Sequence, residues 1–455
     1  MNKWISEINA LINDGSDFPG VLCSVDRMQQ ESISALVAAG MSRDYACGFL
    51  LKIANYLIGK YQYRYRHDYQ IALPFALIVD PSNSCPLHCP GCLHNRTFQH
   101  KIGPDWPEGN LDPEVYSAFI KRFGPYASTV LFYNWGEPLL NRHTPSFIRQ
   151  AKSYLLHTSL SSNLSVKFDA EALVLSGLDY MILSIDGATR QSYEHYRRGG
   201  RFDLVLDNVR KLVEAKKRHK MATPMLSWQF LMFEHNKHEV EQAKALAREL
   251  GVNDIKFARP YDVIWEPELV PCKDAAGDLY VVGYEQGPGY NCFDLMANTS
   301  PSFSGIFQDS WFAKLPSGHE SMFNKRQGRT CQWLYTSISM DAHGRYLPCC
   351  YVPRNNAGFS YVFADARLGG EVNPFNSELY RYSRQHFAWL SELERPDGVA
   401  PMLSDGQPAT YCVACPDRYG EPLVSAFHLK RYLQGLDSFG VLSPESVEMI
   451  AFWER

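Results

Sequence analysis

Residues 74–260 alternate between short apolar runs and longer segments with apolar residues at helical spacing. Continuous apolar runs of this length predict strands that are buried on both faces. The predicted strands are 75–80, 129–133, 158–162, 180–185, 225–232 and 254–257, and the predicted helices are 113–122, 145–156, 168–176, 189–196, 203–217 and 236–250. This alternation predicts a parallel α/β sheet with right-handed crossovers. Six units are fewer than the eight of a closed α/β barrel, so we expect a partial (β/α)6 barrel.

The segments on either side of this α/β region have different patterns. Residues 1–70 carry apolar residues at helical spacing, such as Ile33, Leu36, Phe49 and Ile53, and predict helices. The expected organisation is an N-terminal helical segment (1–70), the partial barrel (71–260), an irregular connector rich in Pro, Gly and Ser (261–330), a cysteine-rich domain (331–420) and a C-terminal helical tail (421–455).

Composition limits the classes of protein that this chain can be. A length of 455 residues suggests two or three domains, and a hydrophobic fraction of 45% is typical of a globular chain. The net charge of −4 gives no basic surface for nucleic acid. The sequence has no signal-peptide core and no run of transmembrane length, so we expect a cytoplasmic protein. For its 12 cysteines, metal or cluster binding is then a better interpretation than disulfides.

Three cysteines follow the first predicted strand within eight residues. They are Cys85, Cys89 and Cys92, separated by three and then two residues. Thiolates are soft ligands that suit zinc or iron–sulfur clusters. A structural zinc site needs a fourth ligand, which only His88, His94 or a distant residue could supply. The loop alone therefore leaves both kinds of site open.

Polar residues and one glycine also follow or end the next four predicted strands. They are Gly136, Glu137, Ser161, Asn163, Ser184, Asp186 and Gln229. Each one alone could be a turn former. Parallel α/β sheets place their chemistry at the carboxyl ends of their strands, so the shared position of these residues indicates a binding site there.

A second cysteine set lies in the C-terminal third of the chain. Cys331, Cys349, Cys412 and Cys415 could together form a four-thiolate site. Cys350 is spare, although it could exchange roles with Cys349. Zinc ribbons have a similar arrangement of cysteines, so this pattern does not identify the metal.

The cysteine loop resembles the signature of the radical S-adenosylmethionine (SAM) superfamily. Gly136-Glu137-Pro138 resembles the end of that family's Gly-Gly-Glu-Pro stretch, with Trp135 in place of the first glycine. Gly91 is a further departure, because the family usually has an aromatic residue before the third cysteine. The spacing of Cys331, Gly344 and Cys349 resembles the SPASM/twitch extension of these enzymes, in its shorter, one-cluster form.

The resemblance implies two iron–sulfur clusters and a SAM site. A [4Fe-4S] cluster at Cys85, Cys89 and Cys92 would keep one iron open for SAM, and an auxiliary [4Fe-4S] cluster would be fully ligated by the second set. Glu137 would accept a hydrogen bond from the SAM ammonium, and Gly136 would allow close backbone approach. The remaining SAM contacts would come from Ser161, Asn163, Ser184, Asp186, Gln229 and either Arg198 or its neighbour Arg197.

The resemblance also implies an oxidoreductase-type activity. Such an enzyme cleaves SAM reductively and uses the 5′-deoxyadenosyl radical to abstract hydrogen from an unactivated carbon. Because residues 1–70 predict helices only, we expect a sugar- or aminocyclitol-like metabolite that is oxidised or epimerised, with Cys350 as a candidate hydrogen donor. The alternatives are a peptide maturase and a zinc-binding protein without enzymatic activity. Expected partners are the substrate and a flavodoxin- or ferredoxin-type electron donor, with no nucleic acid or membrane.

Overall fold

The computed structural model describes most of the chain up to residue 260 and parts of the remainder. The described residues are 1–92, 94–95, 108–260, 267–272, 280–283, 303, 307, 310–316, 323–325, 330–350, 352, 362–367, 373–392, 412 and 442–446. The predicted ligand Cys415 and most of the predicted connector and tail lie outside these ranges.

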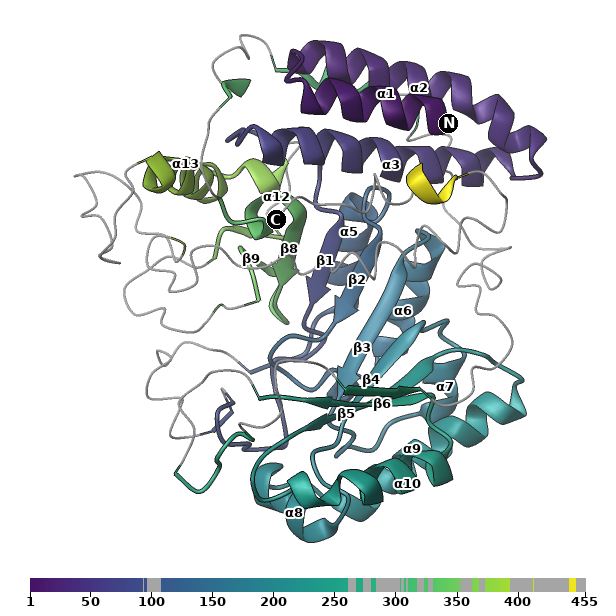
Figure 1. Cartoon of the computed structure of the whole chain (residues 1–455), viewed down its shortest axis with the longest axis vertical. Coiled ribbons are helices and arrows are strands. Elements are labelled where there is room, and N and C mark those ends of the chain that lie inside the picture. The colour runs from purple at the N-terminus through teal and green to yellow at the C-terminus, as the bar shows by residue number, and fades with distance from the viewer. Residues whose placement is uncertain are drawn as a thin grey trace.

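Three helices form a layer of their own at one end of the molecule (Figure 1). They are α1 (Asn2–Asn13), α2 (Phe18–Ala38) and α3 (Arg43–Arg64). Asp17 and Ser42 cap α2 and α3 by accepting hydrogen bonds from first-turn N–H groups. The predicted N-terminal helical segment is therefore confirmed. No helix in the described part of the chain is both long and apolar enough to cross a membrane.

Six parallel strands follow one another in the sheet in chain order. They are β1 (Ala76–Val79), β2 (Thr129–Phe132), β3 (His157–Ser162), β4 (Tyr180–Ser184), β5 (Met225–Leu231) and β6 (Asp254–Ala258). The predicted α/β fold with six parallel strands is confirmed. Sequential pairing of this kind leaves every carboxyl end at the same edge of the sheet.

The helices that connect these strands also match the prediction, with small differences at their ends. They are α5 (Pro113–Phe123), α6 (Thr144–Ser153), α7 (Ala170–Val174), α8 (Arg190–Tyr196), α9 (Phe202–Arg218) and α10 (Val240–Leu250), with short 3-10 turns η1 (Pro138–Leu140) and η2 (Lys237–Glu239). The predicted helix 145–156 ends early because Leu155 adopts a φ of 60°, which lies outside the right-handed helical region.

Four further strands extend the sheet at both edges. β7 (Tyr280–Gly283) pairs antiparallel with β6, and β8 (Ser337–Met340) pairs parallel with β1. β9 (Arg345–Leu347) and β10 (Ala364–Asp365) then follow β8. The segment with the second cysteine set therefore shares one ten-stranded sheet with the barrel strands. The same C-terminal segment also contains the short helix α12 (Trp333–Thr336) and the longer helix α13 (Glu378–Glu392).

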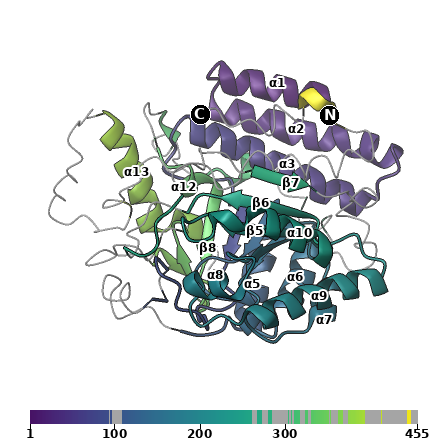
Figure 2. The ribbon, with the colours of Figure 1, turned by 60° about the horizontal axis from the view of Figure 1, so that its bottom comes forward.

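The N-terminal helices lie at the amino ends of β1 and β2. The Lys52 amine on α3 donates to the carbonyl oxygens of Gly124 and Ala127 before β2, and the Asn55 amide donates to the carbonyl oxygen of Leu73 before β1. Figure 2 again shows α1, α2 and α3 at the end opposite α7, α8 and α9. The carboxyl edge of the first strands, where the cysteine loop begins, therefore faces away from this layer (Figure 1).

Candidate active site

The cysteine loop after β1 packs in a small apolar core at the carboxyl edge of the sheet. Cys89 is buried there, and Cys85 and Cys92 pack against it while remaining partly exposed. The other members of this core are Leu87, Tyr196, Leu231, Phe233 and Leu269. Gly91 adopts a φ of 78°, a left-handed conformation that favours glycine, which accounts for the absence of an aromatic residue here.

The surroundings of these thiols disfavour a thiolate whose charge is not compensated. Burial raises the pKa of the Cys85 thiol and raises the pKa of the Cys89 thiol to about 12. Both thiols therefore stay protonated near neutral pH unless a positive charge compensates for the lost hydration. Among the described residues, no group of three or more His, Cys, Asp or Glu side chains is already arranged to hold a metal ion. The donor set and its dry surroundings nevertheless fit a soft metal cluster, whose charge would stabilise thiolates.

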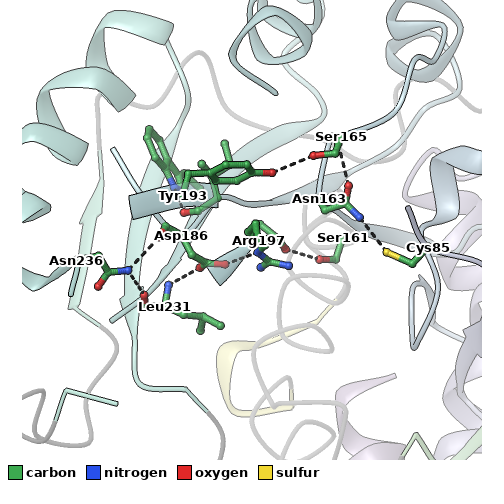
Figure 3. Close-up of polar contacts among 12 residues, drawn as sticks. Cys85, Ser161, Asn163, Ser165, Asp186, Tyr193, Arg197, Leu231 and Asn236 are labelled. Atoms are coloured by element: carbon green, nitrogen blue, oxygen red, sulfur yellow. Dashed lines mark hydrogen bonds and ion pairs between the residues drawn. The ribbon is translucent and has the colours of Figure 1, made fainter. Parts of the chain in front are cut away.

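Asn163 directs an amide N–H at the cysteine loop. Its Nδ2 lies 3.4 Å from the Cys85 sulfur, and its Oδ1 accepts a hydrogen bond of 2.8 Å from the Ser165 N–H. The Ser165 hydroxyl in turn lies 3.0 Å from the Tyr193 hydroxyl. Figure 3 shows this line of contacts from Tyr193 to Cys85. Because Oδ1 accepts from the Ser165 N–H, the orientation of the amide is fixed, with Nδ2 toward the Cys85 sulfur.

The turn after β2 packs directly on the cysteine loop. A Cβ atom on Gly136 would lie 1.6 Å from the Ser82 carbonyl oxygen, so only glycine fits. The next N–H, that of Glu137, donates to the Ser84 carbonyl oxygen at 2.8 Å. The close approach expected of Gly136 is therefore found, and its partner is the backbone before Cys85.

The Glu137 carboxylate, predicted to accept a hydrogen bond from SAM, also accepts hydrogen bonds from the protein. The side chain is buried, and its oxygens accept hydrogen bonds from the Ser162 hydroxyl and the Asn163 N–H, each at 2.8 Å, and from the Leu139 N–H at 3.1 Å. Burial raises the pKa of this carboxyl to about 7, although these hydrogen bonds oppose the shift. Glu137 thus joins the end of β2 to the end of β3.

Asp186, also predicted as a SAM contact, bonds groups of the protein through both oxygens. It is fully buried, and its Oδ2 forms an ion pair of 2.5 Å with the Arg197 Nε. Its Oδ1 accepts a hydrogen bond of 2.6 Å from the Leu231 N–H (Figure 3). The arginine that reaches the site is therefore Arg197. The backbone carbonyl of Arg198, the arginine that the sequence favoured, accepts from the His88 N–H on the cysteine loop at 2.9 Å.

Arg197 faces both Asp186 and the cysteine loop. Its positive charge and a hydrogen bond oppose the burial effect on the pKa of Cys89. The nearby negative groups, Asp186 first, hold the pKa of the guanidinium well above its usual range against the opposing effect of burial. This cation can therefore stabilise negative charge on the loop sulfurs.

Three other predicted contacts lie on neighbouring strands of the sheet. The Ser161 and Ser184 hydroxyls on β3 and β4 lie 3.2 Å apart. Gln229 on β5 pairs in register with Ser184 and is partly exposed. The structure therefore brings these three residues together at adjoining positions of β3, β4 and β5.

The second cysteine set gathers only in part within the described residues. Cys349 and Val352 are buried in a small core with Trp333, and Cys331, Cys350 and Tyr133 pack against it. Burial raises the pKa of the Tyr380 hydroxyl, and the Cys412 and Cys349 thiols add to this shift. Cys415 lies outside the described residues.

Two polar residues at this edge make contacts that the sequence did not predict. Asp80 looks like a simple strand terminator, but its Oδ1 accepts from the Trp135 N–H at 3.0 Å and from the Gly136 N–H at 3.4 Å. His94 follows the cysteine loop, and its Nε2 hydrogen-bonds the Trp135 carbonyl at 2.8 Å. Their position on either side of Cys85-to-Cys92 could have marked them as site residues. Their partners, Trp135 and Gly136, are distant in sequence, so the contacts themselves could not be predicted.

Comparison with known proteins places this geometry in a family. Residues 79–254 match the radical SAM superfamily. The chain contains a radical SAM domain. The resemblance found in the cysteine loop is therefore confirmed, and the matched residues span β1 to the start of β6, including all three loop cysteines.

Curated relatives and solved structures share parts of this chain. It is 26% identical over 207 residues to the PqqA peptide cyclase of Gluconobacter oxydans, covering 44% of this chain and 54% of the relative. It is 29% identical over 140 residues to the GTP 3′,8-cyclase of Hydrogenovibrio crunogenus, covering 29% and 40% respectively. The chain thus spans about half the length of the curated relatives it matches. The structure of SuiB from Streptococcus suis bound to S-adenosylmethionine covers 72% of this chain and 69% of its own, at 14% identity and a TM-score of 0.40.

Proposed function

We propose that this radical SAM enzyme modifies a peptide. The observation that carries the proposal is the match to a peptide cyclase over 207 residues, at 26% identity. This finding favours the peptide maturase alternative over the sugar or aminocyclitol substrate that the sequence first suggested. The placement of α1, α2 and α3 at the amino ends of β1 and β2 is compatible with either substrate class.

Cys85, Cys89 and Cys92 would hold the cluster that the family implies. When bound, a [4Fe-4S] cluster with SAM supplies the reducing electron and the hydrogen-abstracting group. The chain itself supplies two donors near the sulfurs, since the Asn163 amide points at Cys85 and the Arg197 guanidinium stabilises negative charge at Cys89. Hydrogen bonds and charge of this kind tune the reduction potential of a cluster.

The SAM ligand would lie beside the loop, over the ends of β3, β4 and β5. Ser161, Ser184 and Gln229 offer hydroxyl and amide groups there for a ribose or a carboxylate. Glu137 and Asp186 act on the site through the protein, because their carboxylates fix the strand ends and Arg197. The apolar core of Leu87, Tyr196 and Phe233 excludes water from one side of the loop.

Cys331, Cys349, Cys412 and Cys415 would hold an auxiliary cluster. A complete four-thiolate set leaves no open iron, so its expected role is to pass electrons rather than to bind SAM. Cys350 remains a candidate hydrogen donor that is partly exposed beside Cys349. An electron donor of the flavodoxin or ferredoxin type would complete the system.

The proposal can be tested by separating SAM cleavage from peptide modification. The anaerobically reconstituted enzyme should convert SAM to 5′-deoxyadenosine with dithionite as reductant. Co-expression with short open reading frames from the same genomic neighbourhood should then give a peptide whose mass changes only with the active enzyme. Conversion of a sugar or a nucleotide, with no peptide altered, would contradict the peptide assignment and leave the radical SAM assignment in place.

A further inference from the structure

Trp135 occupies the position where the family pattern has its first glycine, and its contacts explain what an indole does there. The Trp135 N–H donates to Asp80 Oδ1 at 3.0 Å, directly after β1. The Trp135 carbonyl oxygen accepts from His94 Nε2 at 2.8 Å, just after the third loop cysteine. The backbone of Trp135 therefore belongs to the same hydrogen-bonded unit as the cysteine loop.

The side chain of Trp135 reaches in the other direction, to the second cysteine segment. Its Nε1–H donates to the Val352 carbonyl oxygen at 2.6 Å, across 217 positions of sequence. Val352 is fully buried in the core that also contains Cys349, with Cys331 and Cys350 packed against it. One residue thus bonds the loop of the first cysteine set through its backbone and the turn of the second set through its indole.

The preceding residue supports the same connection. With the amide orientation that satisfies both its polar atoms, Asn134 places its nitrogen 3.3 Å from the Cys350 carbonyl oxygen and its oxygen 3.3 Å from the Trp135 indole nitrogen. Tyr133 packs against the Cys349 core as well. Three consecutive residues after β2 therefore contact the segment around Cys349, and a glycine at position 135 would have no side chain to donate.

We propose that Trp135 is a positioning residue that fixes the Cys349–Cys350 turn to the loop carrying Cys85, Cys89 and Cys92. This inference rests on the proposed function for the role of the two cysteine sets, although the physical link does not. Its consequence is that the indole N–H of Trp135 contributes to the geometry between the two sites, beside the contacts of Tyr133 and Asn134. Loss of that donor should loosen the second segment while leaving the first loop, held by Trp135 backbone groups, in place.

Hydrogen exchange of the full chain, measured by mass spectrometry, tests this link without requiring a loaded cluster. Trp135→Phe keeps an aromatic ring and removes only the donor. The exchange of residues 345–352 should accelerate about fivefold, the factor that corresponds to about 1 kcal/mol for one net hydrogen bond. Trp135→Gly should accelerate it further, because the packing of the ring is lost as well. Exchange of residues 80–92 should stay within twofold of the wild type in Trp135→Phe.

Trp228→Phe is the matched control. Its Nε1–H also donates to a carbonyl oxygen at 2.6 Å, that of Ile185, but this bond joins β5 to the residue after β4, and the sheet order separates these strands from β8 and β9. It should leave the exchange of residues 345–352 unchanged. The proposal would be overturned if Trp135→Phe left the exchange of residues 345–352 unchanged, or if Trp228→Phe accelerated it equally.

The same variants distinguish failure of the link from failure of the proposed function. In the reconstituted holoenzyme, Trp135→Phe should cleave SAM within about twofold of the wild type but change the electron paramagnetic resonance spectrum of the auxiliary site. A wild type that never cleaves SAM, together with the expected exchange difference, would reject the proposed function and retain the link. If the wild type cleaves SAM normally and Trp135→Phe changes neither the exchange nor the spectrum, the role of Trp135 is rejected and the radical SAM activity is retained.

Discussion

At the residue scale, several predicted SAM contacts are used inside the protein. Glu137, Asn163 and Asp186 are buried or partly buried, and each bonds groups of the chain. The sequence correctly placed these residues at strand ends because polar side chains follow apolar strands there. It could not show which polar groups pair with one another. Glu137 contacts Ser162, and Asp186 contacts Arg197, only once the strands of the sheet are aligned.

Arg197 and Arg198 offer a direct test of this pairing. Arg197→Ala leaves the fully buried Asp186 carboxylate without its ion pair, so it should lower the free energy of unfolding by about 3–5 kcal/mol. Arg198→Ala should lower it by less, because this change leaves in place both the Asp186–Arg197 ion pair and the hydrogen bond from the His88 N–H to the carbonyl of residue 198. Urea unfolding of the two variants checks this. Equal losses would mean that Arg197 has no special role.

Asp80 should give the protein a pH-dependent stability. Burial raises the pKa of this carboxyl from 3.8 to about 7, with the Trp135 and Gly136 N–H groups opposing the shift and the charge of Asp341 adding to it. A carboxyl with a raised folded pKa makes ionisation unfavourable in the folded state. The stability of the wild type relative to Asp80→Asn should therefore fall as pH rises from about 4 to 7 and stay constant outside that range.

Urea unfolding of both proteins between pH 4 and pH 8 measures this difference. Glu137 and every other titrating group are present in both proteins, so their contributions cancel in the comparison. A difference that is independent of pH, or one that grows in favour of the wild type as pH rises, would contradict the assigned pKa direction.

At the element scale, the alternating pattern predicted the six parallel strands and their helices closely, while strand pairing between distant segments escaped it. Short apolar runs bounded by turn residues define β1 to β6 locally. The pairing of β1 with β8 joins segments that are far apart in the chain. Ser337–Met340 alternates and looks like any strand, so nothing local reveals that its partner is Ala76–Val79.

Helix α3 is joined to the sheet by Asn55, which supplies an element-scale prediction. Its amide donates to the carbonyls of Leu73 and Tyr126 at 2.9 and 3.1 Å and accepts from the Leu73 N–H at 2.8 Å. Asn55→Ala leaves these backbone groups unpaired and should destabilise the protein by about 1–3 kcal/mol. SAM cleavage per folded molecule should stay unchanged, because α3 lies at the amino ends of the strands. If folded Asn55→Ala lost SAM cleavage, this would contradict the conclusion that α3 lies apart from the SAM site.

At the scale of the whole molecule, one open sheet carries both cysteine sets. The N-terminal helices lie at the amino ends of β1 and β2, the first set follows β1, and Cys331 and Cys349 of the second set respectively precede β8 and follow β9 in the chain. Spacing alone pointed to both sets, and the ligand role of the second set stays a prediction. It assigned the second set to a domain of its own, whereas β8 hydrogen-bonds to β1 within the same sheet.

The most direct test of this account is the iron content and SAM cleavage of a cysteine triple variant. With two [4Fe-4S] clusters the wild type should bind about eight irons per chain. Replacing Cys85, Cys89 and Cys92 with alanine should remove about half of the iron and all 5′-deoxyadenosine formation. Replacing Cys23, Cys47 and Cys272, which belong to neither set, should preserve both. Full retention of iron or of SAM cleavage in the loop variant would contradict the assignment of this loop as the cluster site.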